Sequence, residues 1–354
     1  MAGVSITTVS RYVNGRYDAM SGATAQRIAE VIERMGYRPN RLARGMKVSE
    51  SRIIGIVVDD ISNHAVSTYV KTVNDALSAR DYSLLLANTD NDPEREHEYI
   101  EEFIGCQVEG LIVITSGQNA EYLTALRCSG LPIVLLDRGI DPDGTVDTVH
   151  SNGYESAVEC VRYLHGRGFA RIGFFSNSLV HSRTRRERFE GFCDAMRDVC
   201  KADGRKAYYE LAEDGEKGAE DAIRRFLADA AAQGTDTGAD IGAGKAGRPV
   251  MFAVNDSVTI ALLNAMKAMD ISFDRVGLCG FDDFELADMI GPGITVIAQD
   301  YRGMGEAAVE LLLRRVGEAR ERAAGATAAA AGAGALQPPE NVVFANRLIG
   351  RGST

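Results

Sequence analysis

The sequence predicts an α/β protein with a small helical head and a body built on two doubly wound parallel sheets. The chain has 354 residues, too many for one core and enough for two or three domains of about 100 to 200 residues each. From residue 53 onward, short apolar runs alternate with longer amphipathic stretches. That alternation is typical of parallel strands joined by crossover helices.

The first 50 residues predict two helices that carry an excess of positive charge. Ser5 can cap a helix over residues 6–14, since a serine oxygen accepts from unpaired first-turn N–H groups, and Gly15 follows the helix end. An apolar stripe predicts a second helix over residues 21–35. This head has a formal charge of +4, whereas the rest of the chain has −15. The asymmetry favours a polyanion-binding head on an acidic body, with a solvated basic face as the alternative.

Eight runs of β-branched and apolar residues are the expected strands of the body. They span residues 53–58, 82–87, 110–115, 133–136, 171–175, 250–254, 276–281 and 294–298. So many strands divide better between two sheets than within one, with a ligand cleft at their carboxyl ends. Two stretches rich in Ala and Gly, 229–247 and 323–335, are expected to be exposed linkers or insertions, and residues 341–349 to return to the body as a strand.

Several chemistries are disfavoured. The six cysteines show no CxxC pair and no zinc-finger spacing, which predicts buried free thiols and no metal site. Residues 242–247 match GxGxxG and include Lys245, but a low-complexity run precedes them where a nucleotide loop needs a strand. Hydrolase, zinc-protease and kinase signatures are absent, so neither an enzyme nor a cofactor is expected. Without a long apolar run or a secretory signal, the chain is expected to be cytoplasmic and free of membrane segments.

Polar side chains follow four of the expected strands. The pairs are Asp59 with Asp60, Asp137 with Arg138, Asn255 with Asp256, and Asp282 with Asp283. A cleft that holds a polyhydroxylated ligand must supply such donors and acceptors. Any single pair could equally be a turn former, so the repetition is what favours a ligand site.

The motifs of the chain resemble one family of transcription regulators. Residues 2–15, AGVSITTVSRYVNG, resemble AGVSxxTVSRVLNG, the recognition-helix motif of the lactose-repressor/galactose-repressor family (LacI/GalR). Further matches follow in the family's order: MGYRPNRLAR at 35–44, NTDNDPE at 88–94, RFEGF at 188–192, VND at 254–256, GFDD at 280–283 and RLIGRGST at 347–354. The resemblance therefore spans the whole chain.

This resemblance implies a helix-turn-helix head for the major groove, a hinge helix for the minor groove, and a periplasmic-binding-protein-like body. Residues 1–50 would form the head and hinge, and residues 51–354 an effector-binding and dimerisation body. Its N-lobe would span about 51–151 and 299–328, and its C-lobe about 152–298 and 338–354. The implied function is a homodimeric repressor of carbohydrate-use genes that binds operator DNA under the control of a sugar-like effector.

The same resemblance assigns residues to DNA contact. They are Ser5, Thr7, Thr8, Ser10, Arg11, Asn14, Asn40, Arg41, Arg44 and Met46. Arg11 can contact a guanine with both arms of its guanidinium, whereas Asn14, Arg41 and Arg44 suit phosphates. Met46 stands at the position of the family's wedge leucine and can enter a base step.

The residues that the resemblance assigns to effector binding are Asp60, Asn63, Arg138, Arg188, Asn255, Asp282 and Gln299. Arg188 would hold ligand hydroxyls or a carboxylate with its planar fork, and Asp282 would accept from hydroxyls. A basic surface loop is the alternative for Arg188, since Arg183, Arg185 and Arg186 stand beside it.

Three departures from the family pattern carry expectations of their own. Family members begin with a further helix, TIKDVAxxAGVS, whereas this chain starts at Met1, so the first half of the helix-turn-helix is expected to be missing. A sugar-sensing binding protein whose head no longer binds DNA is therefore the alternative function. Residues 59–66, DDISNHAV, replace the usual PDIxNPFF, which removes the aromatic pair of the sugar pocket and predicts an unusual ligand. Gly45 weakens the hinge helix by up to about 1 kcal/mol relative to alanine.

Overall fold

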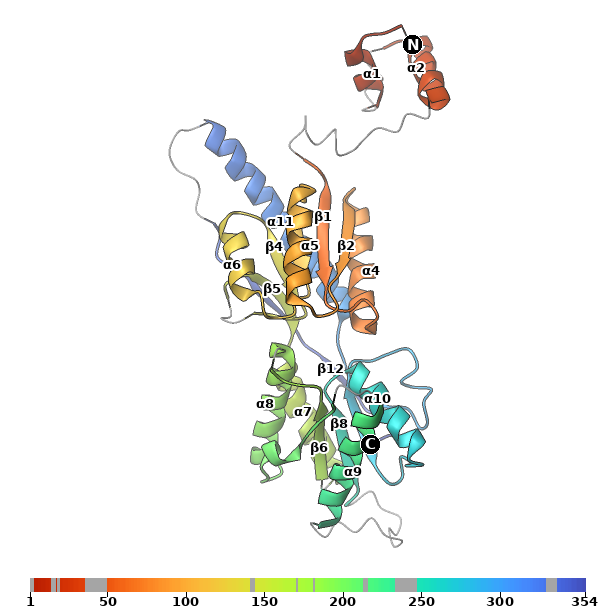
Figure 1. Cartoon of the computed structure of the whole chain (residues 1–354), viewed down its shortest axis with the longest axis vertical. Coiled ribbons are helices and arrows are strands. Elements are labelled where there is room, and N and C mark those ends of the chain that lie inside the picture. Colours follow the sequence, from red (N-terminus) through yellow and green to blue (C-terminus); the bar gives the residue numbers. More distant parts are fainter. Residues whose placement is uncertain are drawn as a thin grey trace. The chain divides into compact units, whose positions relative to one another are not determined.

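The computed structural model divides the chain into two compact units, Met1–Arg52 and Ile53–Thr354 (Figure 1). It describes residues 3–13, 17, 20–35, 50–140, 144–169, 171–180, 182–212, 216–232, 247–328 and 336–354. The Gly-rich stretch with Lys245 lies outside these ranges except for Gly247, and so does the expected hinge helix.

The first unit contains two helices that each begin after a serine cap. They are α1 (Ile6–Val13) and α2 (Gly22–Met35). The Oγ of Ser5 accepts from the Thr8 N–H at 3.2 Å, and the Oγ of Ser21 accepts from the Thr24 N–H at 3.3 Å. α1 contacts α2, whose Ile28 is only 1% exposed. The two predicted helices are thus confirmed over these residues.

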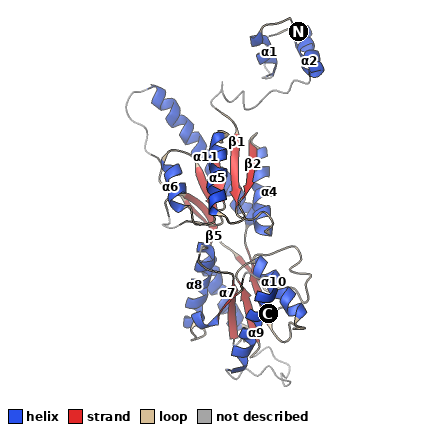
Figure 2. Ribbon diagram, in the orientation of Figure 1, coloured by secondary structure: helices blue, strands red, loops and turns tan. Residues whose placement is uncertain are grey.

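The second unit begins with a six-stranded parallel sheet that we call the N-lobe sheet. Its order is β11-β5-β4-β3-β1-β2. The strands are β1 (Ile53–Val58), β2 (Ser83–Asn88), β3 (Gly110–Val113), β4 (Ile133–Leu136), β5 (Asp147–Ser151) and β11 (Asn341–Phe344). Alternation along β1 sends Ile54, Ile56 and Val58 toward one face and Val57 toward the other. Helices α4 (His64–Ser78) and α11 (Tyr301–Ala328) cover the first face, and α5 (Pro93–Gly105) and α6 (Ala120–Cys128) the second (Figure 2).

The remaining strands form the C-lobe sheet, in the order β12-β10-β9-β8-β6-β7. They are β6 (Arg171–Ser176), β7 (Tyr208–Glu210), β8 (Pro249–Ala253), β9 (Gly277–Phe281), β10 (Thr295–Ala298) and β12 (Arg347–Ile349). All neighbours are parallel except β12, which runs antiparallel to β10. The flanking helices are α7 (Gly153–Gly166), α8 (Arg183–Asp198), α9 (Glu216–Ala232) and α10 (Asp256–Ala268), with a short 3-10 helix η2 (Gly204–Ala207) before β7. Buried aromatic rings, including Phe174 and Phe252 at 5.5 Å, dominate this core.

The eight expected strands are confirmed, and the structure corrects three other expectations. Residues 341–349 form two strands, and β11 joins the N-lobe sheet, so placing all of 338–354 in the C-lobe was wrong. Helix α9 continues through residue 232 with Ala230 buried, and α11 continues to Ala328, so the starts of both Ala-rich stretches are helical. Alanine has the strongest helix propensity, which accounts for both extensions. Among the described helices, none combines the length and the hydropathy needed to cross a membrane.

Of the six free cysteines, Cys160 and Cys279 are buried, whereas Cys106 and Cys128 are exposed. The expectation of buried thiols is therefore wrong for the latter two. Both lie at the solvent-facing ends of helices α5 and α6, where packing does not require a small apolar side chain.

Candidate functional site

Three chain crossings connect the two lobes, and hydrogen bonds tie them together. The crossings follow β5, β10 and β11, and we call residues 151–152, 299 and 346 the hinge. Asn346 N–H donates to Asn152 Oδ1 at 2.8 Å, and Asn346 Nδ2 donates to Ser151 Oγ at 3.3 Å. Ser151 Oγ in turn donates to Gln299 Oε1 at 2.5 Å. Each crossing therefore contacts at least one other through its own side chains.

A cavity lies beside the hinge, between the carboxyl ends of strands from both sheets. We call it the interlobe cavity, and it is lined by Asn63, Ala65, Val66, Asp137, Arg138, Ser182, Thr184, Arg185, Arg188, Asn255, Asp282 and Gln299. The empty space in and around its mouth is about 430 Å³, open solvent included. An adjoining opening shares Asn63, Arg138, Arg185 and Asn255 with it and adds Asp59 and Asp60. This is where α/β sheets place ligands, because strand ends and helix starts leave polar groups there.

The structure brings six of the seven predicted effector residues to one cavity. Asn63, Arg138, Arg188, Asn255, Asp282 and Gln299 all line it. Asp60 lines only the adjoining opening, where its Oδ1 accepts from the Ser62 N–H at 2.9 Å and from the Ser62 hydroxyl at 2.6 Å. The contact of each residue with an effector stays a prediction.

Arg188 is a buried residue of α8, only 4% exposed, so the alternative of a basic surface loop does not hold. Its Nη1 donates to the Val254 carbonyl at 2.7 Å and lies 4.0 Å from Asp282 Oδ2. Its guanidinium carbon lies 3.9 Å from the centroid of the Phe281 ring. Within the described ranges, its buried Nε has no hydrogen-bond partner. The guanidinium is therefore oriented by protein contacts while part of its donor capacity is unused.

Two aspartates reach the cavity from left-handed backbone positions at strand ends. Asp137 follows β4 with φ 67°, and Asp282 follows β9 with φ 73°. Aspartate tolerates this conformation better than most residues do. Asp282 is buried and accepts from Gln299 Nε2 at 2.6 Å, and Asp137 accepts from the Tyr69 hydroxyl at 3.3 Å. Burial raises the pKa of Asp137, whereas the charges of Arg138 and Arg188 oppose that rise.

Two of the predicted amides also cap helices. Asn63 Oδ1 accepts from the Ala65 N–H at 2.9 Å at the start of α4, and Asn255 Oδ1 accepts from the Val258 N–H at 3.0 Å at the start of α10. The amide nitrogen of Asn63 donates across the cleft to Asp256 Oδ1 at 3.2 Å. Asn63 therefore links the lobes, and burial raises the pKa of its partner Asp256, with Asp282 acting in the same direction.

Sequence reasoning missed Arg185 as a cavity residue. Its Nη1 donates to the Ser178 carbonyl at 3.1 Å, and no ion pair joins it to any residue that the structure describes. Burial, followed by the charges of Arg138 and Arg188, lowers the pKa of Arg185 to about 10. The available signal was spacing, because residues three apart on a helix share a face and Arg185 precedes Arg188 by three.

Asp59 was expected only as a strand-end residue, and the structure makes it the partner of Arg138. Its Oδ2 lies 2.6 Å from Arg138 Nη2, and its side chain is buried. Arg138 Nη1 also donates to Asn91 Oδ1 at 3.4 Å. Asp59 thus positions Arg138 at the cavity, while its Oδ1 has no hydrogen-bond partner among the described residues.

In the first unit, the predicted DNA-binding residues that can be placed lie on α1 or at its start. Ser5, Thr7, Ser10 and Arg11 are exposed, and Thr8 is half-buried, its hydroxyl 2.9 Å from the Ser5 hydroxyl. Thr7 and Arg11 are four residues apart and share one helix face. Asn14, Asn40, Arg41, Arg44 and Met46 lie outside the described residues.

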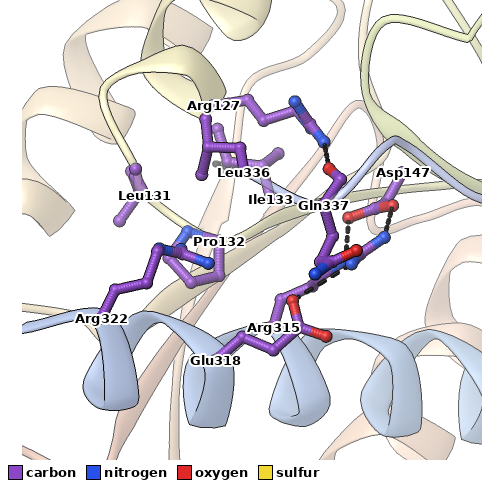
Figure 3. A pocket seen from close by; sticks show the side chains of 11 residues that line it. Arg127, Leu131, Pro132, Ile133, Asp147, Arg315, Glu318, Arg322, Leu336 and Gln337 are labelled. Atoms are coloured by element: carbon purple, nitrogen blue, oxygen red, sulfur yellow. Dashed lines mark hydrogen bonds and ion pairs between the residues drawn. The ribbon is translucent and has the colours of Figure 1, made fainter. Parts of the chain in front are cut away.

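A second depression, beside α11, contains a paired set of charges around Arg315 (Figure 3). Arg315 donates from Nε and Nη2 to the two Asp147 oxygens at 2.9 and 2.8 Å, and from Nη1 to Glu318 at 3.1 Å. Arg127 donates to the Gln337 carbonyl at 2.5 Å. These groups satisfy one another and fasten α11 to β5, which is a structural role. Among the described residues, no group of three or more His, Cys, Asp or Glu is placed to hold a metal ion.

Comparison with known proteins finds a matching family profile in each of the two units. The profile of bacterial regulatory proteins of the lacI family matches residues 1–40, and that of the periplasmic binding protein-like domain matches residues 161–354. The regulator PtxS of Pseudomonas aeruginosa is 31% identical over 354 residues, covering 100% of this chain and 93% of its own. The regulator KdgR of Bacillus subtilis is 30% identical and covers 89% of this chain and 88% of its own.

Solved structures share the fold. The lac repressor dimer bound to operator and the anti-inducer ONPF has a TM-score of 0.74 at 20% identity, covering 99% of this chain and 95% of its own. The CelR–cellobiose complex has a TM-score of 0.67 at 22% identity, covering 100% of this chain and 97% of its own. The resemblance seen in the motifs is confirmed, and the enzyme alternative is set aside because these relatives are regulators. The chain belongs to the lacI family of bacterial regulatory proteins and is a DNA-binding transcriptional regulator.

Proposed function

We propose that this regulator is a cytoplasmic, homodimeric repressor of carbohydrate-use genes whose operator affinity is set by a small sugar-like effector in the interlobe cavity. The observation that carries the proposal is Gln299, which lines the cavity and also belongs to the hinge. Two related structures support the class of ligand, one with cellobiose and one, from Enterococcus faecium, with bound ribose.

The proposed mechanism is linkage between the two units. An effector that touches both lobes stabilises one angle between them, and the hinge bonds of Ser151, Gln299 and Asn346 adjust to that angle. In the dimer, the changed angle alters the spacing of the paired heads and so the operator affinity. Couplings of this kind are typically worth 1–3 kcal/mol, or about 5- to 150-fold in affinity.

The head would use α1 as its reading element. The exposed Thr7 and Arg11 would face base edges in the major groove, and Arg11 could form a bidentate contact with guanine. A two-fold dimer places two such helices on half-sites about one helical turn apart, so the operator should be near-palindromic.

The test uses the full chain with duplexes selected from a random pool and measures binding by fluorescence anisotropy at physiological salt. We expect the selected duplex to be near-palindromic and to bind about a thousandfold or more tightly than its shuffled version. Arg11→Ala should remove most of that preference, whereas Arg27→Ala, on the exposed side of α2, should preserve it.

Equal binding of the selected and shuffled duplexes would contradict the proposal. If a sugar still bound the cavity in that case, the alternative function, a sugar-sensing protein whose head does not bind DNA, would be favoured instead.

A further inference from the structure

We propose that the effector is a polyhydroxylated anion, with a carboxylate or phosphate group held by Arg185 and Arg188, and that Arg185 selects for this charge. The inference rests on the proposed function, since it takes the interlobe cavity as the effector site. It adds the chemical class of the ligand and a specificity residue.

The arginines that line the cavity differ in how their charges are compensated. Arg138 has a close partner, because Asp59 Oδ2 lies 2.6 Å from its Nη2. Arg188 has only a distant one, the Asp282 carboxylate at 4.0 Å, and that carboxylate already accepts from Gln299 at 2.6 Å. Arg185 forms no ion pair within the described part of the chain and donates only to a backbone carbonyl. Two guanidinium groups therefore lack a close counter-charge.

Arg185 also lies close enough to the other two guanidinium groups to feel their charge. The charges of Arg138 and Arg188 both lower its pKa, after the larger effect of burial, and the more weakly acting Asp59 opposes them. Arg185 and Arg188 lie on the same face of α8, one turn apart, which keeps the two side chains neighbours. A bound anion would replace this repulsion with charge-assisted hydrogen bonds, which planar guanidinium groups form well with carboxylate and phosphate.

The cavity offers hydrogen-bonding groups but little apolar surface to a sugar ring. Its lining residues, all within the described ranges, include no aromatic side chain, and the only apolar side chains among them are Ala65 and Val66. The nearby Phe281 ring is covered by the Arg188 guanidinium at 3.9 Å. Affinity must therefore come from charged and polar contacts rather than from stacking.

The other groups in the cavity explain why the ligand should carry hydroxyls as well. Asp137 and Asp282 can accept from hydroxyl groups, and Ser182 and Thr184 can exchange hydrogen bonds with them. A sugar acid or a sugar phosphate combines such hydroxyls with one anionic end. Its anionic end would meet Arg185 and Arg188, and its hydroxyls would meet the aspartates.

The experiment measures thermal stabilisation of the full chain by matched probes at constant ionic strength. They are D-glucose, D-gluconate and D-glucose 6-phosphate, the corresponding galactose compounds, and inorganic phosphate compared with chloride. We expect stabilisation by anionic probes but not by their neutral parents. The gluconate and phosphate arms then distinguish a sugar acid from a sugar phosphate.

Variants assign the effect to the cavity. Arg185→Gln should weaken binding of the anionic probe at least tenfold, and Arg185→Lys, which keeps the charge without the planar fork, should fall between. Arg186→Gln is the matched control, because Arg186 is the next residue of α8 but does not line the cavity.

Three results would overturn the inference: a neutral sugar that stabilises as well as its acid, an anion effect that Arg185→Gln does not change, or no anion, inorganic phosphate included, that stabilises more than chloride. A neutral sugar that releases the operator would refute the anionic ligand and leave the proposed function standing. An anion that binds through Arg185 without changing operator affinity would support the anionic ligand and refute the proposed function.

Discussion

Gln299 Nε2 donates a hydrogen bond to Asp282 Oδ1 across 2.6 Å, and this contact joins the hinge to the wall of the interlobe cavity. The same amide accepts from Ser151, which lies at another of the three crossings. A ligand that engages Asp282 must therefore either keep this bond or compete with it. A ligand that competes for Asp282 would therefore change a hydrogen bond of the hinge.

Gln299→Ala should uncouple ligand binding from DNA binding more than it weakens either. We expect the effector to bind within about tenfold of wild type, with the coupling to operator affinity reduced by about 0.5–2 kcal/mol. Anisotropy titrations with and without saturating effector measure this. Gln118→Ala, at an exposed position, is the control, and wild-type coupling in Gln299→Ala would refute the role of the hinge bond.

Arg188→Lys should lower effector affinity about tenfold to a hundredfold, as expected for loss of a charge-assisted hydrogen bond of 1.5–3 kcal/mol. Lysine keeps the positive charge but can neither present a planar fork nor lie flat over Phe281. Isothermal calorimetry gives the affinity, and circular dichroism confirms that the variant is folded. Unchanged affinity in a folded variant would remove Arg188 from the site.

Gly191→Ala should destabilise the C-lobe by about 1–3 kcal/mol, a typical cost of overpacking. An added Cβ there would lie 2.3 Å from the Tyr154 carbonyl oxygen, so α8 would have to move away from α7. Arg188 lies one turn before Gly191, so a shift of α8 should also displace Arg188 from its position in the interlobe cavity.

Gly317→Ala is the matched control for this prediction. Apart from its chain neighbours and the backbone of its own helix, no described atom lies within 4 Å of its added Cβ, and in the middle of α11 the exchange should stabilise by about 0.5–1 kcal/mol. Urea unfolding measures both variants. Equal effects of the two substitutions would show that close packing at Gly191 is not the cause.

Asp137→Asn should change how stability depends on pH. Because burial raises the pKa of Asp137 in the folded protein, the native state holds this proton to higher pH than the unfolded chain does. Stability from this group is then lost as pH rises above the ordinary aspartate pKa of about 3.9. Asparagine tolerates the left-handed backbone at this position and removes the effect, so the variant should gain stability over wild type at pH 7 and lose that advantage near pH 3.

Asp75→Asn should change stability at neutral pH in the opposite direction. The Lys71 side chain lowers the pKa of Asp75 by hydrogen bonding, so the charged form is favoured in the folded state. Its replacement should reduce stability slightly at neutral pH, with the difference vanishing in acid. Urea unfolding at several pH values tests the pair, and identical pH profiles for Asp137→Asn and wild type would contradict the burial argument.

The sequence predicted strands that are mostly apolar runs, whether fully buried like β3 or partly exposed like β2. β5 was missed because its sequence, DTVHS, has Val149 as its one apolar residue, and its Asp147 is stabilised by Arg315, far away along the chain. β7 was missed because it has only three residues. Strand character in residues 341–349 did not reveal that the chain changes lobes, which depends on the bonds of Asn346 at the hinge.

For the site, too, local sequence pattern indicated some residues, whereas others depend on how the elements pack. Polar residues at strand ends indicated Arg138, Asn255 and Asp282, all of which line the cavity. Which residue of the pair Asp59 and Asp60 pairs with Arg138 depends on how the strand ends, and the structure selects Asp59. The spacing of Arg185 and Arg188 places both on one face of α8, but that this face lines the cavity depends on the rotation of α8 against the lobe.

The most direct test of the account is reciprocity between the two sites. Operator affinity is measured by anisotropy with and without saturating effector, and effector affinity by calorimetry with and without the operator duplex. The account predicts that both affinities change by the same factor, at least about fivefold, because linkage is reciprocal. An operator affinity that is identical with and without bound effector would contradict it.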